Sequence, residues 1–186
     1  DFSYEVSRSI AACEGALLIV DATQGVEAQT ISNLYLAIDN GLDIIPVINK
    51  IDLQNAMVDE VSEQIIELIG CKKEDIILAS AKTGIGTQDI LEAIVDKIPP
   101  ANVEMDKPLK ALIFDSKFDI YRGVIVYVRV FEGSIKEGDE IKLFFTGNKF
   151  VAEEVGNLKM GRVRTKTLNS GDVGYLIAGI KDVNES

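Results

Sequence analysis

The stretch Ile44-Ile45-Pro46-Val47-Ile48-Asn49-Lys50-Ile51-Asp52 decides how the first half of this chain folds. Its apolar start predicts a parallel strand that is covered on both faces. Because Pro46 removes one hydrogen-bond donor, we expect it at an edge or a bulge of the sheet. The polar end, Asn49 to Asp52, follows the carboxyl end of the strand, where open parallel sheets bind their ligands.

Two further apolar runs and three amphipathic stretches surround this strand. The runs are Ala16–Val20, which ends in Asp21, and Ile76–Ala79; the predicted helices are Thr30–Asn40, Val58–Ile69 and Gln88–Ile98. Gly41 and Gly70 are expected to end the first two helices, and Thr87 to cap the start of the third. This alternation predicts an α/β domain of right-handed βαβ units over residues 1–98.

The second half of the chain differs from the first in the spacing of its apolar residues. After Pro99-Pro100, residues 99–107 are predicted to be a linker, and from Pro108 apolar residues alternate with a period of two. The predicted strands are Leu109–Phe118, Val124–Phe131, Glu140–Phe145, Phe150–Val155 and Gly174–Ile180. Several short strands separated by turns predict a small antiparallel β-barrel over residues 108–186.

Composition excludes several classes of protein. The chain has 186 residues, of which 47% are hydrophobic, and is therefore expected to be globular. It has no apolar run near the roughly 18 residues of a membrane span, which leaves only a peripheral association with the inner membrane open. The absence of histidine excludes a His-based catalytic triad or His-ligated metal within these residues. Cys13 and Cys71 are not spaced as metal ligands, which predicts reduced thiols and a cytoplasmic protein.

The two halves of the chain differ in net charge. Residues 1–98 carry 17 acidic and 6 basic side chains, whereas residues 99–186 carry 13 of each. An acidic chain argues against nonspecific DNA binding, but the second half can approach a polyanion. Lys159, Arg162, Arg164 and Lys166 cluster in a predicted exposed loop, Leu158–Thr167. They are candidate contacts for RNA phosphates, and the alternative of a solvated loop that balances the acids of the barrel stays open.

Two polar segments end successive predicted strands. They are Asn49-Lys50-Ile51-Asp52 and Ser80-Ala81-Lys82. The carboxylate of Asp52 offers two acceptors that match the adjacent N1–H and N2–H₂ donors of guanine. Adenine lacks this donor pair, and each buried group left unsatisfied costs about 1–3 kcal/mol. A four-residue match alone is a common accident, but two such segments in order argue against one.

The neighbouring residues suit the same base. Asn49 is expected to donate to the N7/O6 edge and to join the two loops. Lys50 is expected to lay its alkyl stem over the base while its ammonium stays in water. The backbone N–H of Ala81 is expected to donate to O6, and Lys82 to cover the other face of the base. Together with Ser80 and Asp52, these residues form the predicted nucleotide-binding site.

These two segments resemble the guanine-specificity loops of P-loop GTPases. The barrel, with Arg122-Gly123 after its first strand and Gly133–Asp139 between strands, is similar to the second domain of translational GTPases. The stretches Asp1–Ser9, Val20–Thr30 and Ile177–Val183 are similar to the LepA-type elongation factors. The resemblance covers essentially the whole chain.

The resemblance implies a GTPase that binds GTP or GDP with Mg²⁺ and acts on the ribosome during elongation or translocation, with ribosomal RNA as partner. In that family, hydrolysis uses a phosphate-binding loop and a switch histidine. The 186 residues contain neither a G-x-x-x-x-G-K-[ST] motif nor a histidine, and they open at Asp1 without Met. We therefore expect an internal fragment with a partial GTPase domain, no catalytic or metal-binding residue, and weak nucleotide binding or none.

If the chain is an internal fragment, strands are also expected to be missing at the edges of both domains. Strands missing before Gly15–Asp21 would leave that strand as an apolar edge, which predicts self-association through it. The barrel is expected to lack its closing strand after Asp182-Val183. Two functions stay open: the base-reading part of a ribosome-linked GTPase, or a module that docks on the ribosome or a partner without using nucleotide.

Overall fold

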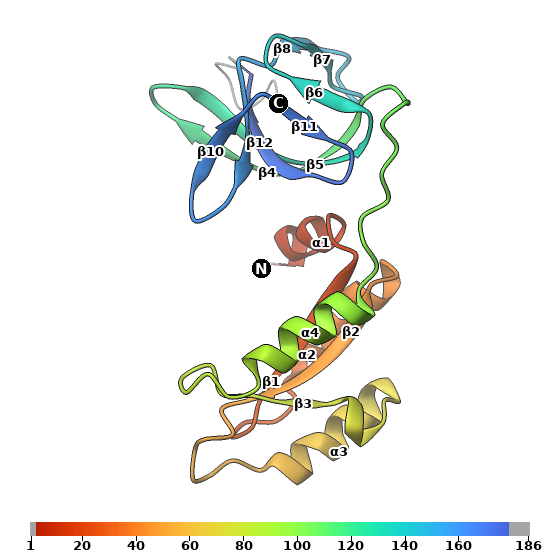
Figure 1. Ribbon diagram of the computed structural model, residues 1–186, viewed down its shortest axis with the longest axis vertical. Helices are drawn as coiled ribbons and strands as arrows, with labels where there is room; N and C mark the ends of the chain where they lie inside the picture. The colour runs from red at the N-terminus through yellow and green to blue at the C-terminus, as the bar shows by residue number, and fades with distance from the viewer. Residues whose placement is uncertain (1–2, 179–186) are drawn as a thin grey trace. The chain divides into compact units, whose positions relative to one another are not determined.

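The computed structural model describes residues 3–178. The chain divides into two units, Asp1–Pro100 and Ala101–Ser186, each with its own core. Within the residues described, none of the helices combines the length and apolar character needed to cross a membrane. The predicted succession of an α/β unit and an antiparallel β unit is confirmed (Figure 1).

The first unit is a three-stranded parallel sheet with helices on both faces. The elements in chain order are α1 (Ser3–Ile10), β1 (Gly15–Asp21), α2 (Ala28–Asp39), β2 (Asp43–Asn49), α3 (Val58–Ile69), a short 3₁₀ helix (Lys73–Asp75), β3 (Ile77–Leu78) and α4 (Thr87–Lys97). The strand order is β1-β2-β3, and all pairs are parallel. The register places Asp21 beside Asn49, so the carboxyl ends of β1 and β2 lie together.

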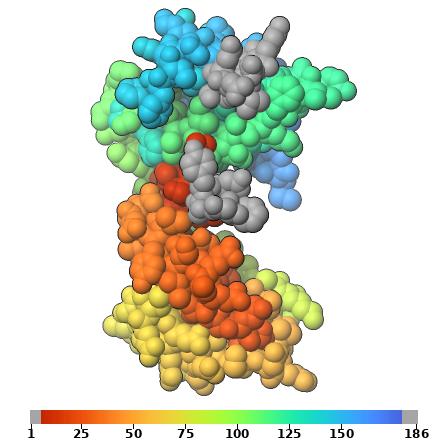
Figure 2. Space-filling view, turned by 180° about the vertical axis from the view of Figure 1, so that it is seen from behind, coloured from red at the N-terminus to blue at the C-terminus, as the bar shows by residue number. Residues whose placement is uncertain are grey.

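Two apolar layers hold this sheet. Leu18 and Val20 of β1 pack with Leu34 of α2 and with Val61 and Ile65 of α3. The opposite face packs against α4, through the apolar residues Ile45, Val47, Ala79, Ile90 and Ile94. Figure 2 shows the first unit from behind, where the orange and yellow side chains of α2 and α3 form its surface. Burial on both faces explains why the strands are continuously apolar.

Pro46 lies in the central strand β2, so the expected edge or bulge position is wrong. The Ile48 carbonyl accepts a hydrogen bond from the Ala79 N–H, so alternate residues of β2 direct their backbone groups toward β3. Pro46 is two residues earlier, but β3 pairs only with Val47 and Ile48. The missing donor of Pro46 therefore faces a stretch where β3 offers no partner.

The helix ends follow the glycines. Gly70 ends α3 in the left-handed conformation, as predicted. Thr87 is the first residue of α4 and not its N-cap; the cap position belongs to Gly86, at φ +75°. A Cβ on Gly86 would lie 2.2 Å from the carbonyl oxygen of Leu78, so the close approach of the loop to β3 requires glycine.

The second unit consists of short antiparallel strands. They are β4 (Lys110–Asp119), β5 (Gly123–Glu132), β6 (Ser134–Lys136), β7 (Glu140–Lys142), β8 (Lys149–Val151), β9 (Glu154–Leu158), β10 (Arg162–Thr165), β11 (Thr167–Asn169) and β12 (Val173–Ile177). A five-stranded sheet has the order β10-β9-β12-β5-β4, and the pairs β11-β6 and β7-β8 complete the unit. Glu104, inside the predicted linker, bonds to this unit because its N–H donates to Ser170 Oγ.

Alternation along β5 builds the core of this unit. Val124, Val126, Val128 and Val130 are all buried in one cluster with Ile135 and Leu168, which confirms their predicted common face. Ile125, on the other face, is also buried, in a second cluster with Tyr175 and Ile177.

In this unit one predicted strand and one predicted loop are wrong, the predicted strand Glu140–Phe145 ends already at Lys142, and three strands were not predicted. The predicted strand Phe150–Val155 is split between β8 and β9, because the Glu153 N–H leaves the hairpin and donates to the Ile177 carbonyl. The predicted loop Leu158–Thr167 contains β10, which pairs with β9. The short strands β6, β10 and β11 were missed. Residues 179–186, where the absence of a closing strand was expected, lie outside the described residues.

Candidate nucleotide-base site

Asn49 joins the two predicted loops. Its side-chain Oδ1 accepts hydrogen bonds from the Lys50 N–H at 2.8 Å and from the Ala81 N–H at 3.0 Å. A third bond, from the Ile51 N–H to the Ala79 carbonyl at 3.3 Å, adds to this connection. Because Oδ1 is occupied, the amide nitrogen of Asn49 is the group that can donate to a ligand. The Ala81 N–H, expected to meet guanine O6, here donates to Asn49 instead.

Ser80 is buried and stabilises the second loop, residues 80–85. Its side chain is fully buried, and its Oγ accepts a hydrogen bond from the Thr83 N–H at 3.2 Å. The Ser80 carbonyl accepts from the Gly84 N–H, and the Ser80 N–H donates to the Ile85 carbonyl. These bonds fold residues 80–85 into a tight turn that leaves Ala81 and Lys82 exposed. Ser80 therefore supports the loop and is not placed to touch a ligand with its side chain.

Lys50 is held by a carboxylate from the neighbouring strand. Its Nζ lies 2.5 Å from Asp21 Oδ2, whereas the sequence predicted an ammonium in water. Thr23 donates to Asp21 Oδ1 through both its N–H, at 2.8 Å, and its hydroxyl, at 2.7 Å. The bond from Lys50, followed by that from the Thr23 N–H, lowers the pKa of Asp21 to about 2. Lys50 also has φ +67°, in the left-handed region that costs a non-glycine residue about 1–2 kcal/mol.

Asp21 was missed by sequence reasoning, which gave it no role in the site. The available signal was that it ends the strand next to β2, in register with Asn49. Its ion pair fixes the Lys50 side chain on the side of the loop that faces β1. An ammonium held in this way positions the alkyl stem of Lys50, which is the part predicted to cover the base.

The two residues predicted to contact the ligand most directly are open to solvent. Asp52 and Lys82 are both exposed, and within residues 3–178 neither side chain makes a hydrogen bond or an ion pair. The structure thus brings the loops of Asn49 and Ala81 together and leaves a carboxylate and an ammonium available beside them. Reading of guanine by Asp52 stays a prediction. The described residues hold no acidic or Cys cluster that fits a metal, so we assign no Mg²⁺ ligand here.

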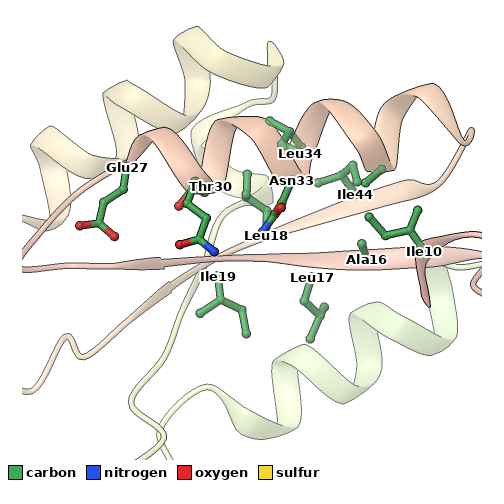
Figure 3. A pocket seen from close by; sticks show the side chains of 12 residues that line it. Ile10, Ala16, Leu17, Leu18, Ile19, Glu27, Thr30, Asn33, Leu34 and Ile44 are labelled. Atoms are coloured by element: carbon green, nitrogen blue, oxygen red, sulfur yellow. The ribbon is translucent and has the colours of Figure 1, made fainter. Parts of the chain in front are cut away.

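A hollow of about 350 Å³ lies elsewhere, beside β1 and α2. Its polar lining includes Thr30 and Asn33, and its apolar lining includes Leu17, Leu18 and Ile19. Figure 3 shows Leu18 directed toward α2, with Leu17 and Ile19 directed toward α4. None of the predicted base-binding residues lines this hollow, which follows the free edge of the sheet.

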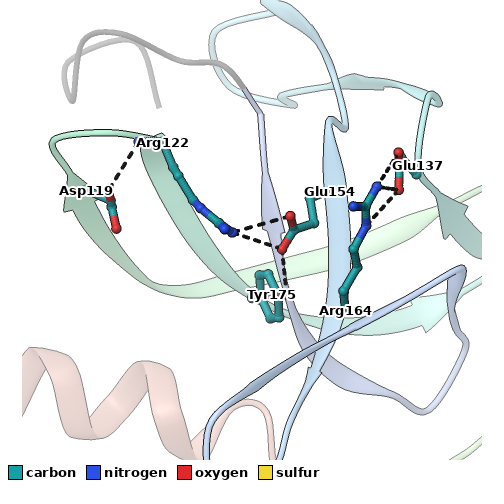
Figure 4. Close-up of polar contacts among 6 residues, drawn as sticks. All are labelled: Asp119, Arg122, Glu137, Glu154, Arg164 and Tyr175. Atoms are coloured by element: carbon teal, nitrogen blue, oxygen red, sulfur yellow. Dashed lines mark hydrogen bonds and ion pairs between the residues drawn. The ribbon is translucent and has the colours of Figure 1, made fainter.

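The four basic candidates for RNA contact lie in and around β10, and within residues 3–178 a carboxylate pairs with only one of them. Arg164 forms a two-oxygen ion pair with Glu137, with N–O distances of 2.6 and 2.7 Å from Nη2 (Figure 4). This bond raises the pKa of Arg164. Lys159 and Lys166 are exposed, in the turns that precede and follow β10.

Arg162 lies over an aromatic ring. Its guanidinium carbon is 5.8 Å from the centroid of the Tyr175 ring. The Tyr175 hydroxyl donates to Glu154 Oε1 at 2.7 Å, and Arg122 Nη1 lies 3.3 Å from the same carboxylate (Figure 4). Glu154 is thereby satisfied by Tyr175 and Arg122. The charge of Arg162 is positioned by stacking and stays available to an anion.

Comparison with known proteins gives two family matches. The elongation factor Tu GTP-binding domain matches residues 1–100, and elongation factor Tu domain 2 matches residues 123–186. Elongation factor 4 from Amoebophilus asiaticus is 58% identical over 185 residues, and that from Pelodictyon phaeoclathratiforme is 61% identical over 186. Each alignment covers 100% of this chain and 31% of the relative.

A solved structure agrees with these matches. The bacterial selenocysteine-specific elongation factor EF-Sec has a TM-score of 0.76 and 25% identity over 97% of this chain and 31% of its own. The predicted resemblance to the LepA-type factors is confirmed by the whole-chain identity to proteins named elongation factor 4. With residues 1–100 matched by the GTP-binding domain and residues 123–186 by domain 2, the chain belongs to the elongation factor Tu-type family of translational GTPases.

Proposed function

We propose that the first unit is the guanine-reading part of a translational GTPase that works in the cytoplasm on the ribosome during elongation. In the complete protein, GTP binds with Mg²⁺ and is hydrolysed. The family match and the names of the relatives support the class of activity. The observation that carries the assignment to residues is the bond from Ala81 N–H to Asn49 Oδ1, because it holds two loops with base-binding chemistry at one end of the sheet.

Asp52 supplies the discrimination. A carboxylate that accepts two hydrogen bonds from guanine leaves both oxygens unpaired against adenine. Its exposure in the free chain means that it need not break an existing ion pair to meet the base. Lys50 and Lys82 cover the two faces of the purine with their alkyl stems, and the amide nitrogen of Asn49 donates to N7.

Phosphate contacts supply much of the affinity of GTPases for nucleotide. The 186 residues contain no G-x-x-x-x-G-K-[ST] stretch. We therefore expect this chain by itself to bind GDP weakly and to leave GTP unhydrolysed. Titration of fluorescent GDP against this chain and against the complete protein measures the difference. Failure of the complete protein to bind GDP would favour a docking module that does not use nucleotide.

Substitution of Asp52 by Asn in the complete protein tests the site. Asn offers one donor and one acceptor, which match the edge of xanthine, so preference is expected to move from GDP to XDP. A change of at least tenfold in the ratio of the two affinities, by competition with fluorescent nucleotide, is the expected result. Asp96→Asn, on the exposed surface of α4, is the matched control and should leave the ratio unchanged. Retained guanine preference in Asp52→Asn would refute the role of Asp52.

We also propose that this 186-residue chain self-associates through β1. Among residues 3–178, β1 pairs only with β2, so its other edge is open. Ile19 on this strand is 54% exposed, and the hollow described above runs beside it. An edge of this kind pairs with a second copy about a two-fold axis. Light scattering at high concentration should show a dimer that Ile19→Lys disrupts and that Val95→Lys, on exposed α4, does not; a monomer would refute the proposal.

A further inference from the structure

The tip of the β7–β8 hairpin carries two of the most exposed aromatic side chains in the described residues. Phe144 is 92% exposed and Phe145 98% exposed. Their rings pack edge to face, with centroids 5.8 Å apart and an interplanar angle of 87°. Two adjacent rings in water cost the free protein hydrophobic stabilisation, which points to a partner that covers them.

The tip is an ordered turn. The Leu143 N–H donates to the Asn148 carbonyl at 2.9 Å, and the Gly147 N–H donates to the Leu143 carbonyl at 2.9 Å. Gly147 has φ +73°, which closes the turn. Below the tip, Ile141 and Phe150 pack against the core of the unit. The hairpin thus presents the two rings on a fixed base, which reduces the entropy lost when a ligand binds.

Charge at the base of the tip indicates the kind of partner. The register of the hairpin places Lys142 directly opposite Lys149, an arrangement of like charges that destabilises a strand pair. Lys149 is neutralised by Glu140, with Nζ 2.7 Å from Oε1. No carboxylate of the described residues lies within ion-pair distance of Lys142. An anion bound beside Lys142 would supply the negative charge that no described carboxylate offers to this side chain.

We propose that this tip, residues 142–149, binds an unpaired RNA base, which stacks on Phe144 or Phe145 while Lys142 contacts the adjacent phosphate. Aromatic faces next to cationic side chains are the usual means of binding single-stranded nucleic acid. A paired base has both faces covered by its neighbours and offers no surface to the rings. An apolar protein pocket would accept the two rings but would leave Lys142 without a counter-charge. The proposal rests on the ribosomal association proposed above.

The chain has no tryptophan, so Phe145→Trp creates a single fluorescent reporter at the tip. Titration with a uridine decaribonucleotide is expected to quench this fluorescence through base stacking. The same strand in a duplex with its adenosine complement should quench it far less. Equal quenching by both forms, or none by either, would overturn the proposal.

Affinity for the labelled decamer, by fluorescence anisotropy, gives the second measurement. The double variant Phe144→Ala/Phe145→Ala should bind at least tenfold more weakly, since one stacked base contributes about a five- to 150-fold factor. Tyr121→Ala, which removes an equally exposed ring from the β4–β5 turn, is the matched control and should bind as before. Lys142→Ala should reduce the slope of log affinity against log salt by about 0.7.

One outcome would assign the tip to a protein partner instead of RNA. Loss of ribosome binding in the double variant, without any binding of the decamer to the unmodified chain, would mean a protein contact and refute the RNA assignment. The variants replace exposed side chains, so their unfolding curves should match that of the unmodified chain. The guanine selectivity of the first unit is tested separately, by the nucleotide affinities of Asp52→Asn. A failure of that test can therefore be told apart from a failure of RNA binding at the hairpin tip.

Discussion

The loops of the first unit and the β10 region of the second unit both carry charged residues predicted to bind a ligand. The two regions differ in whether those charges are already paired within the protein. In the first unit, neutral groups from Asn49 and Ser80 join the loops, Lys50 is paired with Asp21, and Asp52 has no ion-pair partner within residues 3–178. In the second unit, Arg164 is itself engaged by Glu137. A residue is therefore a good candidate for recognition through its charge where other groups support the backbone, as at Asp52, and a poor one where its charge is already paired, as at Arg164. Lys50, which is paired with Asp21, can offer its alkyl stem instead.

The largest effect is expected at the end of the second loop, where Gly86 lies against the backbone of β3. Gly86→Ala places a Cβ 2.2 Å from the Leu78 carbonyl oxygen and should lower the free energy of unfolding of the first unit by about 3 kcal/mol or more. Gly84→Ala shares the left-handed backbone, at φ +83°, but meets no atom within 4 Å, so it should lower that free energy by only about 1 kcal/mol. Urea unfolding followed by circular dichroism at 222 nm reports on this unit, which contains all helices described. Equal losses in the two variants would contradict the close-approach argument.

Acidification is expected to have a smaller effect on the free energy of unfolding. The pKa of Asp21 is about 2 in the folded chain against 3.8 ordinarily, so its contribution to stability is present above pH 4 and is lost as the pH falls toward 2. The expected contribution is about 1–2 kcal/mol. The stability difference between pH 6 and pH 2.5 should therefore be smaller in Asp21→Asn by that amount. Asp96→Asn, an exposed control on α4, should keep the difference of the unmodified chain. An unchanged pH dependence in Asp21→Asn would show that the Lys50–Asp21 pair stabilises nothing.

The sequence predicted the elements whose signals are local. The helix Val58–Ile69 was predicted at its observed bounds, because an amphipathic stripe ends at a glycine. The alternating valines of β5 likewise revealed their common face. The two loops predicted to bind the base do lie at strand ends, since each follows an apolar strand and carries its own polar residues; base binding itself stays a prediction. These features depend on residues that are close in sequence.

The features that were missed depend on distant partners. The position of Pro46 in a central strand is tolerated because β3 is too short to reach it, and the length of β3 is not visible from residues 44–48. The strand β10 has the polar sequence Arg-Val-Arg-Thr, and only its pairing with β9 makes it a strand. Glu137 lies 27 residues before Arg164, and Asp21 lies 29 residues before Lys50. Neither ion pair has a local signature, so both basic residues were expected to face solvent.

The smallest effect is expected from the basic residues of β10, and it separates two neighbours of the same type. Arg162 is positioned on Tyr175 with its charge available, whereas Arg164 is paired with Glu137. If this region contacts ribosomal RNA, Arg162→Ala should weaken ribosome binding by less than tenfold and reduce the salt slope by about 0.7–0.9, the loss of one phosphate contact. Arg164→Ala should leave the slope unchanged, because the arginine it removes already has a carboxylate partner. Co-sedimentation of the complete protein with ribosomes across a salt series measures both slopes. Equal slopes in the two variants and the unmodified protein would favour the solvated surface over the RNA contact, whereas an equal reduction in both would mean that Arg164 exchanges Glu137 for a phosphate on binding.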